Sequence, residues 1–344
     1  MNSFLKLWDK QIFSREFSLK AILSNCDAYL SEYLGKSKKD ITGGQFADLV
    51  HLIARSQAES IHTFEQKIVH RLQHIFLNDN AELYVFSLGE ILKLYRGFQS
   101  LNDYFNKEKV IEGIVEIVLE SNFYEDEALL ELLKEFRKVG LLEKYQELIV
   151  KGRVYFQERF DLMERRTILG FLELFRDYGM LFEDKEVALL MRDHMASTFH
   201  AYELSELFNA HRLLSHSFYR DSDTFRIIED AVKIRAADKE QVLQLQAGDI
   251  GSLLSGMVLH KEKSKRLEGS LKSILRLRPG LLAADQRLLV KTVSYLEDFE
   301  VKVDEELKGH INDSFKVHLD NLTPDEISHL RLYGKSLLTA ENYN

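Results

Sequence analysis

Glycine pairs in this sequence could contribute to a phosphate-binding loop, and a histidine pair could contribute to a metal site. Each site requires a longer motif, and the surrounding residues do not complete one. A phosphate-binding loop needs glycines followed by Lys and then Ser or Thr, but Gly251 and Gly256 are followed by Met257 and Val258. Gly43 and Gly44 follow no predicted strand, so we interpret them as a loop before a helix and not as a dinucleotide site. The sequence therefore predicts no cofactor.

Histidines offer no complete set of metal ligands either. His70 and His74 are one helical turn apart and supply only two of the ligands that zinc requires. Ser, His and Asp residues lie in no strand-turn-helix elbow that would mark a nucleophile. We therefore predict no metal site and no catalytic residues. An enzyme in a helical fold stays open as an alternative, and it would need a pocket with convergent polar groups.

Basic side chains gather between His260 and Arg278. Seven Lys and Arg residues stand there against two Glu residues, a local charge of +5 in a chain whose net charge is −9. They could neutralise RNA phosphates, an acidic protein surface or anionic lipid head groups, or form a solvated helix face. This stretch has no aromatic residue on which a base could stack. The predicted basic patch consists of Lys261, Lys263, Lys265, Arg266, Lys272, Arg276 and Arg278.

The composition favours helices. Only 2 prolines and 17 glycines occur in 344 residues, which leaves few turn residues for a sandwich or barrel. Cys26 is the single cysteine, so no intramolecular disulfide forms, as in proteins of reducing or organellar interiors. The acidic balance opposes general attraction to a phosphate backbone. We expect no transmembrane segment, because apolar runs such as 111–119 contain acidic residues.

One apolar pattern recurs along the chain. Residues 132–140 and 171–179 both read apolar-apolar-x-x-Phe-Arg-x-apolar-Gly, and looser copies begin at positions 49, 91, 207, 253 and 289. The mean interval is about 40 residues, which is the length of a helical hairpin. His211 stands where other copies have Phe, Tyr or Met, and we interpret it as a packed, hydrogen-bonded histidine.

Helix signals frame these copies. Residues 184–195 and 224–234 predict second helices, and Gly140 and Gly179 predict left-handed C-caps. Pro279 and Gly280 end a helix that runs through residues 271–277. Thr323, Pro324 and Glu326 have the capping-box pattern and predict a terminal helix from Pro324 to Leu338.

The predicted fold is all-α, an α-solenoid of seven to eight antiparallel hairpins. Two helices cannot cover their own apolar face, so each pair needs its neighbour. We divide the chain into an N-terminal helical cap (1–43), a repeat array (44–322) and a C-terminal capping helix with a tail (323–344). A compact multi-helix globule is the alternative.

The first helix of one copy resembles those of organellar helical repeats. The segment Glu203 to Leu214, ELSELFNAHRLL, is similar to the first helix of the octotricopeptide, heptatricopeptide and FAST-kinase-like repeat families. The spacing match extends over most of residues 44–300. The resemblance implies a helical-repeat protein of mitochondria or chloroplasts, acting in RNA metabolism or as a subunit of an organellar ribosome.

We therefore expect a non-catalytic scaffold or interaction subunit of a large organellar assembly, such as a mitochondrial ribosome, whose partners are other protein subunits. The alternative is an RNA-binding repeat protein in organellar RNA processing or stability, using the basic patch. The expected location is mitochondrial, otherwise cytoplasmic. The segment from Met1 to Lys20 weakly resembles a transit peptide, and we interpret it as an amphipathic helix.

Overall fold

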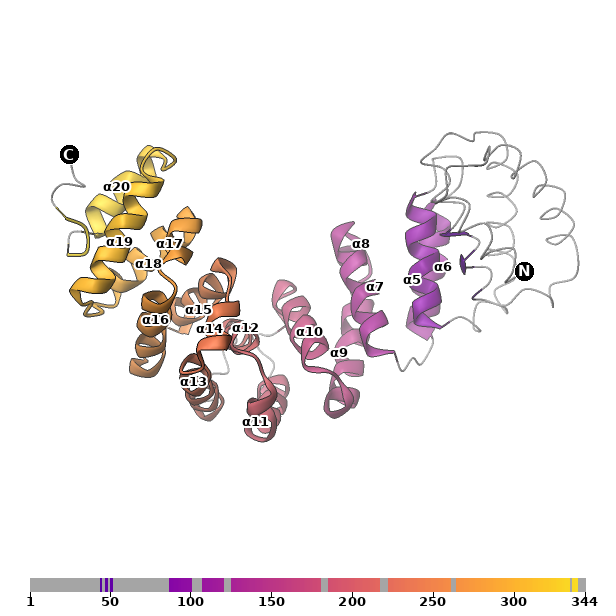
Figure 1. Cartoon of the computed structure of the whole chain (residues 1–344). Helices are drawn as coiled ribbons and strands as arrows, with labels where there is room; N and C mark the ends of the chain where they lie inside the picture. The colour runs from indigo at the N-terminus through magenta and orange to yellow at the C-terminus, as the bar shows by residue number, and fades with distance from the viewer. Residues whose placement is uncertain are drawn as a thin grey trace, which may run out of the picture. The chain divides into compact units, whose positions relative to one another are not determined.

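The structure, a computed structural model, describes residues 87–100, 107–120, 125–180, 185–216, 222–260, 264–334 and 336–339, together with residues 44, 47, 48, 50 and 51 (Figure 1). All regular elements within these ranges are helices, so the all-α prediction is confirmed. The chain divides into two units, Met1–Tyr155 and Phe156–Asn344. None of the described helices is both long and apolar enough to cross a membrane.

The helices alternate between two kinds. First helices are α5 (Leu88–Ser100), α7 (Asp126–Lys138), α10 (Arg165–Asp177), α12 (Leu204–Leu214), α15 (Ala247–His260), α18 (Gln286–Asp298) and α20 (Pro324–Tyr333). Second helices are α6 (Lys107–Glu120), α9 (Glu147–Arg159), α11 (Lys185–Thr198), α13 (Ser222–Ala236), α16 (Lys265–Leu277) and α19 (Glu305–His318). Short helices are α8 (Leu141–Lys144), α14 (Lys239–Gln244) and α17 (Gly280–Ala284), with 3-10 turns η2 (Phe160–Leu162) and η3 (Phe199–Ala201).

The starts of the first helices show an even repeat. The residues that immediately precede them are Ser87, Glu125, Glu164, Glu203, Gln246, Asp285 and Thr323. They recur at intervals of about 39 residues, the length of a helical hairpin, and only the interval from Glu203 to Gln246 is clearly longer. These intervals are more regular than those of the apolar pattern, since an amphipathic stripe repeats every three or four residues and can be aligned one turn early or late.

The ends of the first helices confirm the predicted caps. Gly140 and Gly179 have φ values of 74° and 72°, the left-handed conformation that favours glycine. The Met180 N–H donates to the Phe175 carbonyl at 2.9 Å, the six-to-one bond of a Schellman motif. Glu300 has φ 50° at the end of α18, and the Val301 N–H donates to the Leu296 carbonyl at 2.8 Å.

The position of the left-handed residue corrects the alignment of one predicted copy of the apolar pattern. Gly140, Gly179 and Glu300 each lie at the same sequence separation, about four helical turns, from the residue that precedes their helix. The copy that we aligned at position 289 therefore begins at 292, about one turn later, where Thr292 and Val293 are both buried. The sequence did not reveal this offset, because the cap position was identified from glycines and this copy has Glu there. Counted from Ser87 and Glu203, the copies aligned at 91 and 207 likewise begin about one turn later.

In the first unit, α5 contacts both α6 and α7. The Glu125 carboxylate accepts hydrogen bonds from the backbone N–H groups of Leu88 and Gly89 at 3.2 and 3.1 Å, and so caps the preceding first helix. The rings of Tyr95 and Phe136 meet edge to face at 4.9 Å. Neighbouring first helices are thus joined by both apolar and capping contacts.

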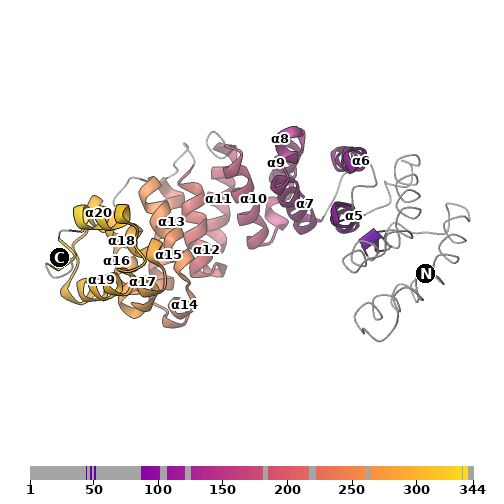
Figure 2. The same cartoon turned by 90° about the horizontal axis from the view of Figure 1, so that it is seen from above.

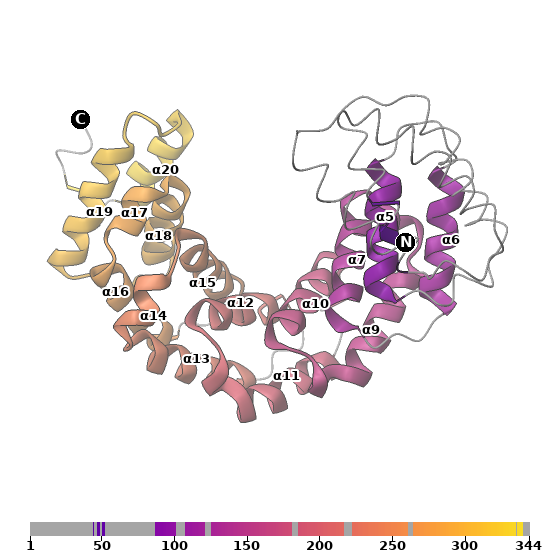
Figure 3. The same cartoon turned by 45° about the vertical axis from the view of Figure 1, so that its right-hand side comes forward.

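In the second unit, successive helix pairs stack in two layers. One layer has α10 against α12, α12 against α15, α15 against α18 and α18 against α20. The other has α11 against α13, α13 against α16 and α16 against α19. Figure 2 and Figure 3 both show α15 beside α12. The described helices of this unit therefore stack consecutively, whereas the number of hairpins predicted for the whole chain stays a prediction.

Arginine–glutamate ion pairs connect neighbouring first helices in each unit. Arg96 of α5 pairs with Glu135 of α7 at 3.2 Å, and Arg212 of α12 pairs with Glu173 of α10 at 3.3 Å. Ion pairs that are partly exposed to solvent, as these are, contribute little stability, but they favour one alignment of the helices.

The C-terminal helix begins as predicted and ends earlier. Thr323 and Glu326 form the capping box, but α20 ends at Tyr333 instead of Leu338. After Gly334 the chain turns back, and Leu337 and Leu338 are buried. The buried Asn312 amide of α19 donates to the Leu337 carbonyl and accepts from the Thr339 N–H, both at 2.8 Å.

Candidate interaction site

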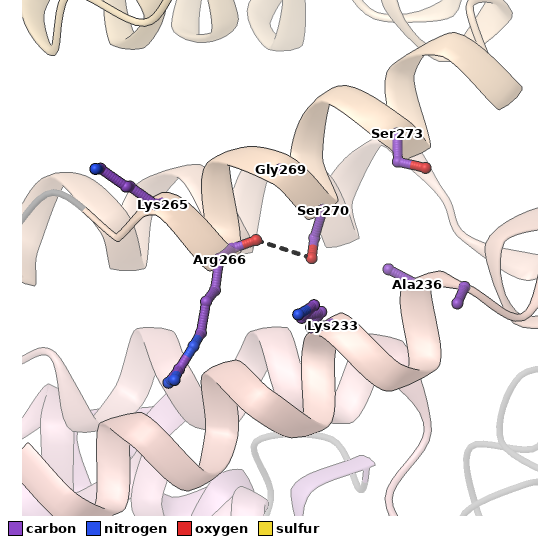
Figure 4. Close-up of a pocket in the computed structure, with 8 residues that line it drawn as sticks. Lys233, Ala236, Lys265, Arg266, Gly269, Ser270 and Ser273 are labelled. Atoms are coloured by element: carbon purple, nitrogen blue, oxygen red, sulfur yellow. Dashed lines mark hydrogen bonds between the residues drawn. The ribbon is translucent and has the colours of Figure 1, made fainter.

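A hollow of about 360 Å³ lies between α13 and α16 in the second unit (Figure 4). Its residues come from the last turn of α13, the residue that follows it and the first three turns of α16. They are Lys233, Ala236, Ala237, Lys265, Arg266, Gly269, Ser270 and Ser273. Five of the eight are Ala, Gly or Ser, so the hollow exists because small side chains do not fill the groove between the two helices.

The amphipathic pattern of α16 positions this wall. Ser264 caps the helix by accepting from the Leu267 N–H at 3.3 Å, and Leu267, Leu271 and Ile274 are fully buried. Lys265, Gly269 and Ser273 recur every four residues and so share one face of the helix. A Cβ atom added at Gly269 would meet nothing within 4 Å, so this face is open.

Three cations line the hollow. Arg266 pairs with Asp230 of α13 at 3.2 Å. The exposed Lys233 and Lys265 form no ion pair with any residue that the structure describes. Figure 4 shows Lys265 and Arg266 diverging from the start of α16, with Lys233 on the opposite wall. Two lysine ammonium groups therefore remain available to a negatively charged ligand.

The structure separates the members of the predicted basic patch. Lys265 and Arg266 line the hollow, whereas Lys272, Arg276 and Arg278 contact neighbouring elements, and Lys261 and Lys263 lie outside the described residues. The Lys272 ammonium donates to the Lys302 carbonyl at 3.3 Å. Arg278 donates to the carbonyls of Val242, at 3.3 Å, and Leu243 near the end of α14.

Arg276 pairs with the N-cap of the next second helix. Its guanidinium contacts the carboxylate of Asp304, which also accepts from the Leu307 N–H at 3.0 Å. The Leu307 N–H and then Arg276 hold the pKa of Asp304 below its usual range. The charge of Arg276 is thus offset within the protein.

Lys233 is the cation of the hollow that the sequence analysis missed. It lies near the end of the preceding second helix, 32 residues before Lys265 and outside the stretch in which basic residues were counted. In the sequence, only the even repeat indicates that α13 and α16 lie side by side, because consecutive repeats are expected to stack.

His211 is buried as predicted but lacks the expected hydrogen bond. Its side chain is fully buried, and neither ring nitrogen has a hydrogen-bond partner. The ring lies 5.3 Å from that of Phe225 and 5.9 Å from that of His260. Burial, followed by the neighbouring His260, lowers its pKa to about 3, so the imidazole is neutral at pH 7.

The structure describes one of the glycine pairs that we did not interpret as binding sites, but not the histidine pair. Gly251 and Gly256 lie inside α15, which is a helix and not a phosphate-binding loop. Among the described residues no group of three or more His, Cys, Asp or Glu side chains could hold a metal ion. His70 and His74, like Cys26, lie outside these residues.

Comparisons with known proteins add no relative. No protein-family model matches the chain, and no curated protein matches it.

Proposed function

We propose that this chain is a non-catalytic interaction subunit, a helical-repeat scaffold that binds other protein subunits of a large assembly. The observation that supports the proposal best is the hollow between α13 and α16, where stacked second helices leave an open surface with two lysines that no described residue pairs with. A repeat array exposes such surfaces along its length, which suits binding to extended partners. The organellar, mitochondrial setting is part of the proposal and rests on the resemblance of residues 203–214 to organellar repeats.

The test is recovery of the native complex. Chromosomally tagged protein should co-sediment with a large particle after gentle lysis, and mass spectrometry should identify the same protein subunits in each fraction. Recovery only as a free monomer would contradict the scaffold role. Fractionation of organelles tests the location separately.

RNA binding is the second candidate, because Lys233 and Lys265 could also contact phosphates. Four cations of the predicted patch, Arg266, Lys272, Arg276 and Arg278, instead contact protein groups. This leaves fewer charges for a polyanion, whose affinity grows with each phosphate neutralised. If RNA is the ligand, replacing Lys263, Lys265 and Arg266 by Glu should abolish RNA binding and flatten its salt dependence. Unchanged binding to an RNA oligonucleotide would exclude this use of the patch.

A further inference from the structure

We infer that the hollow between α13 and α16 binds an acidic amphipathic helix of a partner protein, with one or two small apolar side chains of that helix inserted between Ala236 and Gly269. This inference rests on the proposed function and specifies the chemistry of the partner.

The size and lining of the hollow favour side chains over a cofactor. About 360 Å³ is near the lower end of small-molecule sites, which are usually lined by bulky apolar and aromatic groups. None of the eight lining residues is aromatic, and Ala236, Ala237 and Gly269 present only small surfaces. Small residues on a helix face allow a second helix to approach closely, so that its side chains enter the groove.

The charges of the hollow favour a carboxylate-rich partner. Lys233 and Lys265 stand on opposite walls, and no described residue pairs with either one. Acidic side chains that flank an inserted apolar residue would meet both ammonium groups. Such complementary charges increase the association rate and fix the orientation of the bound segment.

Phosphate and RNA fit the same surface less well. The Ser270 hydroxyl donates to the Arg266 carbonyl at 3.1 Å, the dashed line in Figure 4, and the Leu267 N–H donates to the Ser264 cap. These two donors are therefore already used. A base would find no aromatic side chain in the hollow on which to stack.

The test uses the full chain and a labelled peptide probe. The probe is a fluorescein-labelled amphipathic helix of about 18 residues, with Ala and Leu at helical spacing on one face and Glu on the opposite face. A second peptide has Lys in place of Glu. Fluorescence anisotropy should show that the acidic peptide binds, that binding weakens as salt rises, and that the Lys peptide does not bind.

Two variants test separately the empty space of the hollow and its positive charge. Gly269→Phe fills the hollow, and its Cβ meets nothing within 4 Å, so the fold should be retained. Lys233→Glu with Lys265→Glu reverses the charges. Each should weaken binding of the acidic peptide by roughly tenfold or more, as expected for residues at the centre of an interface. The matched controls are Gly309→Phe and Lys239→Glu, which change exposed positions outside the hollow.

Several results would overturn the inference: no binding of the acidic peptide, equal binding of both peptides, or unchanged binding by Gly269→Phe with a native circular dichroism spectrum. Tighter binding of a uridine oligonucleotide that the charge reversals abolish would assign the hollow to RNA. Failure here is distinct from failure of the proposed function. Co-sedimentation of the Gly269→Phe chain with the large particle would show that the scaffold role uses another surface.

Discussion

His211 shows how one buried residue makes stability depend on pH. Its imidazole is fully buried without a hydrogen bond, and its pKa falls to about 3 because of burial and then His260. The pKa in the unfolded chain is about 6.5. The unfolded state therefore binds more protons below this value, so the stabilising contribution is complete above pH 6.5 and decreases as the pH falls toward 3.

We predict that the free energy of unfolding decreases by about 2 kcal/mol between pH 7 and pH 5 because of this residue. His211→Phe should remove most of this decrease, since a phenyl ring cannot be protonated. Urea unfolding at the two pH values, followed by circular dichroism, measures the difference. His200→Gln, at an exposed histidine, is the control, and equal pH dependence of the His211→Phe and wild-type chains would contradict the explanation.

At the scale of helices, glycine decides how closely α12 and α15 approach each other. The sequence alone does not show which glycine of α15 lies at the contact. Gly251 and Gly256 both belong to α15, but only Gly256 faces α12. A Cβ atom at Gly256 would lie 2.4 Å from the His211 Nδ1 atom and 3.0 Å from the Arg212 Cα atom. A Cβ atom at Gly251 would meet nothing within 4 Å.

Gly256→Ala should therefore destabilise the second unit by roughly 1–3 kcal/mol, because α12 and α15 must separate. Gly251→Ala should stabilise it by about 0.5–1 kcal/mol through helix propensity. The two variants make the same chemical change on one helix, so thermal and urea unfolding should shift in opposite directions. Shifts in the same direction would contradict the close contact.

The left-handed caps give a second pair of predictions, in which two substitutions change the free energy of unfolding in opposite directions. Gly179→Ala should cost about 1 kcal/mol, because a Cβ atom disfavours φ 72°. Glu300→Gly should raise the free energy of unfolding by up to about 1 kcal/mol, since Glu300 has φ 50° at the equivalent position. Urea midpoints measure both, and a loss of stability in Glu300→Gly would indicate that the side chain contributes more than its backbone strain costs.

At the scale of the second unit, contacts are mainly between neighbouring pairs. α12 contacts α10 and α15, and α15 contacts α18, while α20 contacts α18. A repeat array of this kind has a stability close to a sum of unit and interface contributions. A defect in one interface should therefore affect its neighbours first.

Hydrogen exchange should show this locality. In Gly256→Ala, amide protection should fall most in α12 and α15 and least in α20, because two interfaces separate α20 from α15. Mass spectrometry of peptic fragments measures each helix. Uniform loss of protection from α10 to α20 would show that the unit unfolds in one cooperative step.

Local signals predicted much of this architecture. Helical class, the spacing of about 40 residues, the glycine caps and the Thr323 capping box could be predicted, because side-chain periodicity and capping act within a few residues. The alignments at 91, 207 and 289 and the end of α20 were wrong by one turn or more. An apolar stripe fits neighbouring turns equally well, and α20 ends where the segment after Gly334 packs against α19.

The sequence by itself determined that the chain forms helices and how far apart they recur. Only the tertiary structure decided which basic side chains stay available: Arg276 and Arg278 contact groups of neighbouring repeats, while Lys233 and Lys265 share the hollow. The physical reason is that helix formation depends on neighbours along the chain. Pairing of charges depends instead on which repeats stack, and with what offset, in three dimensions.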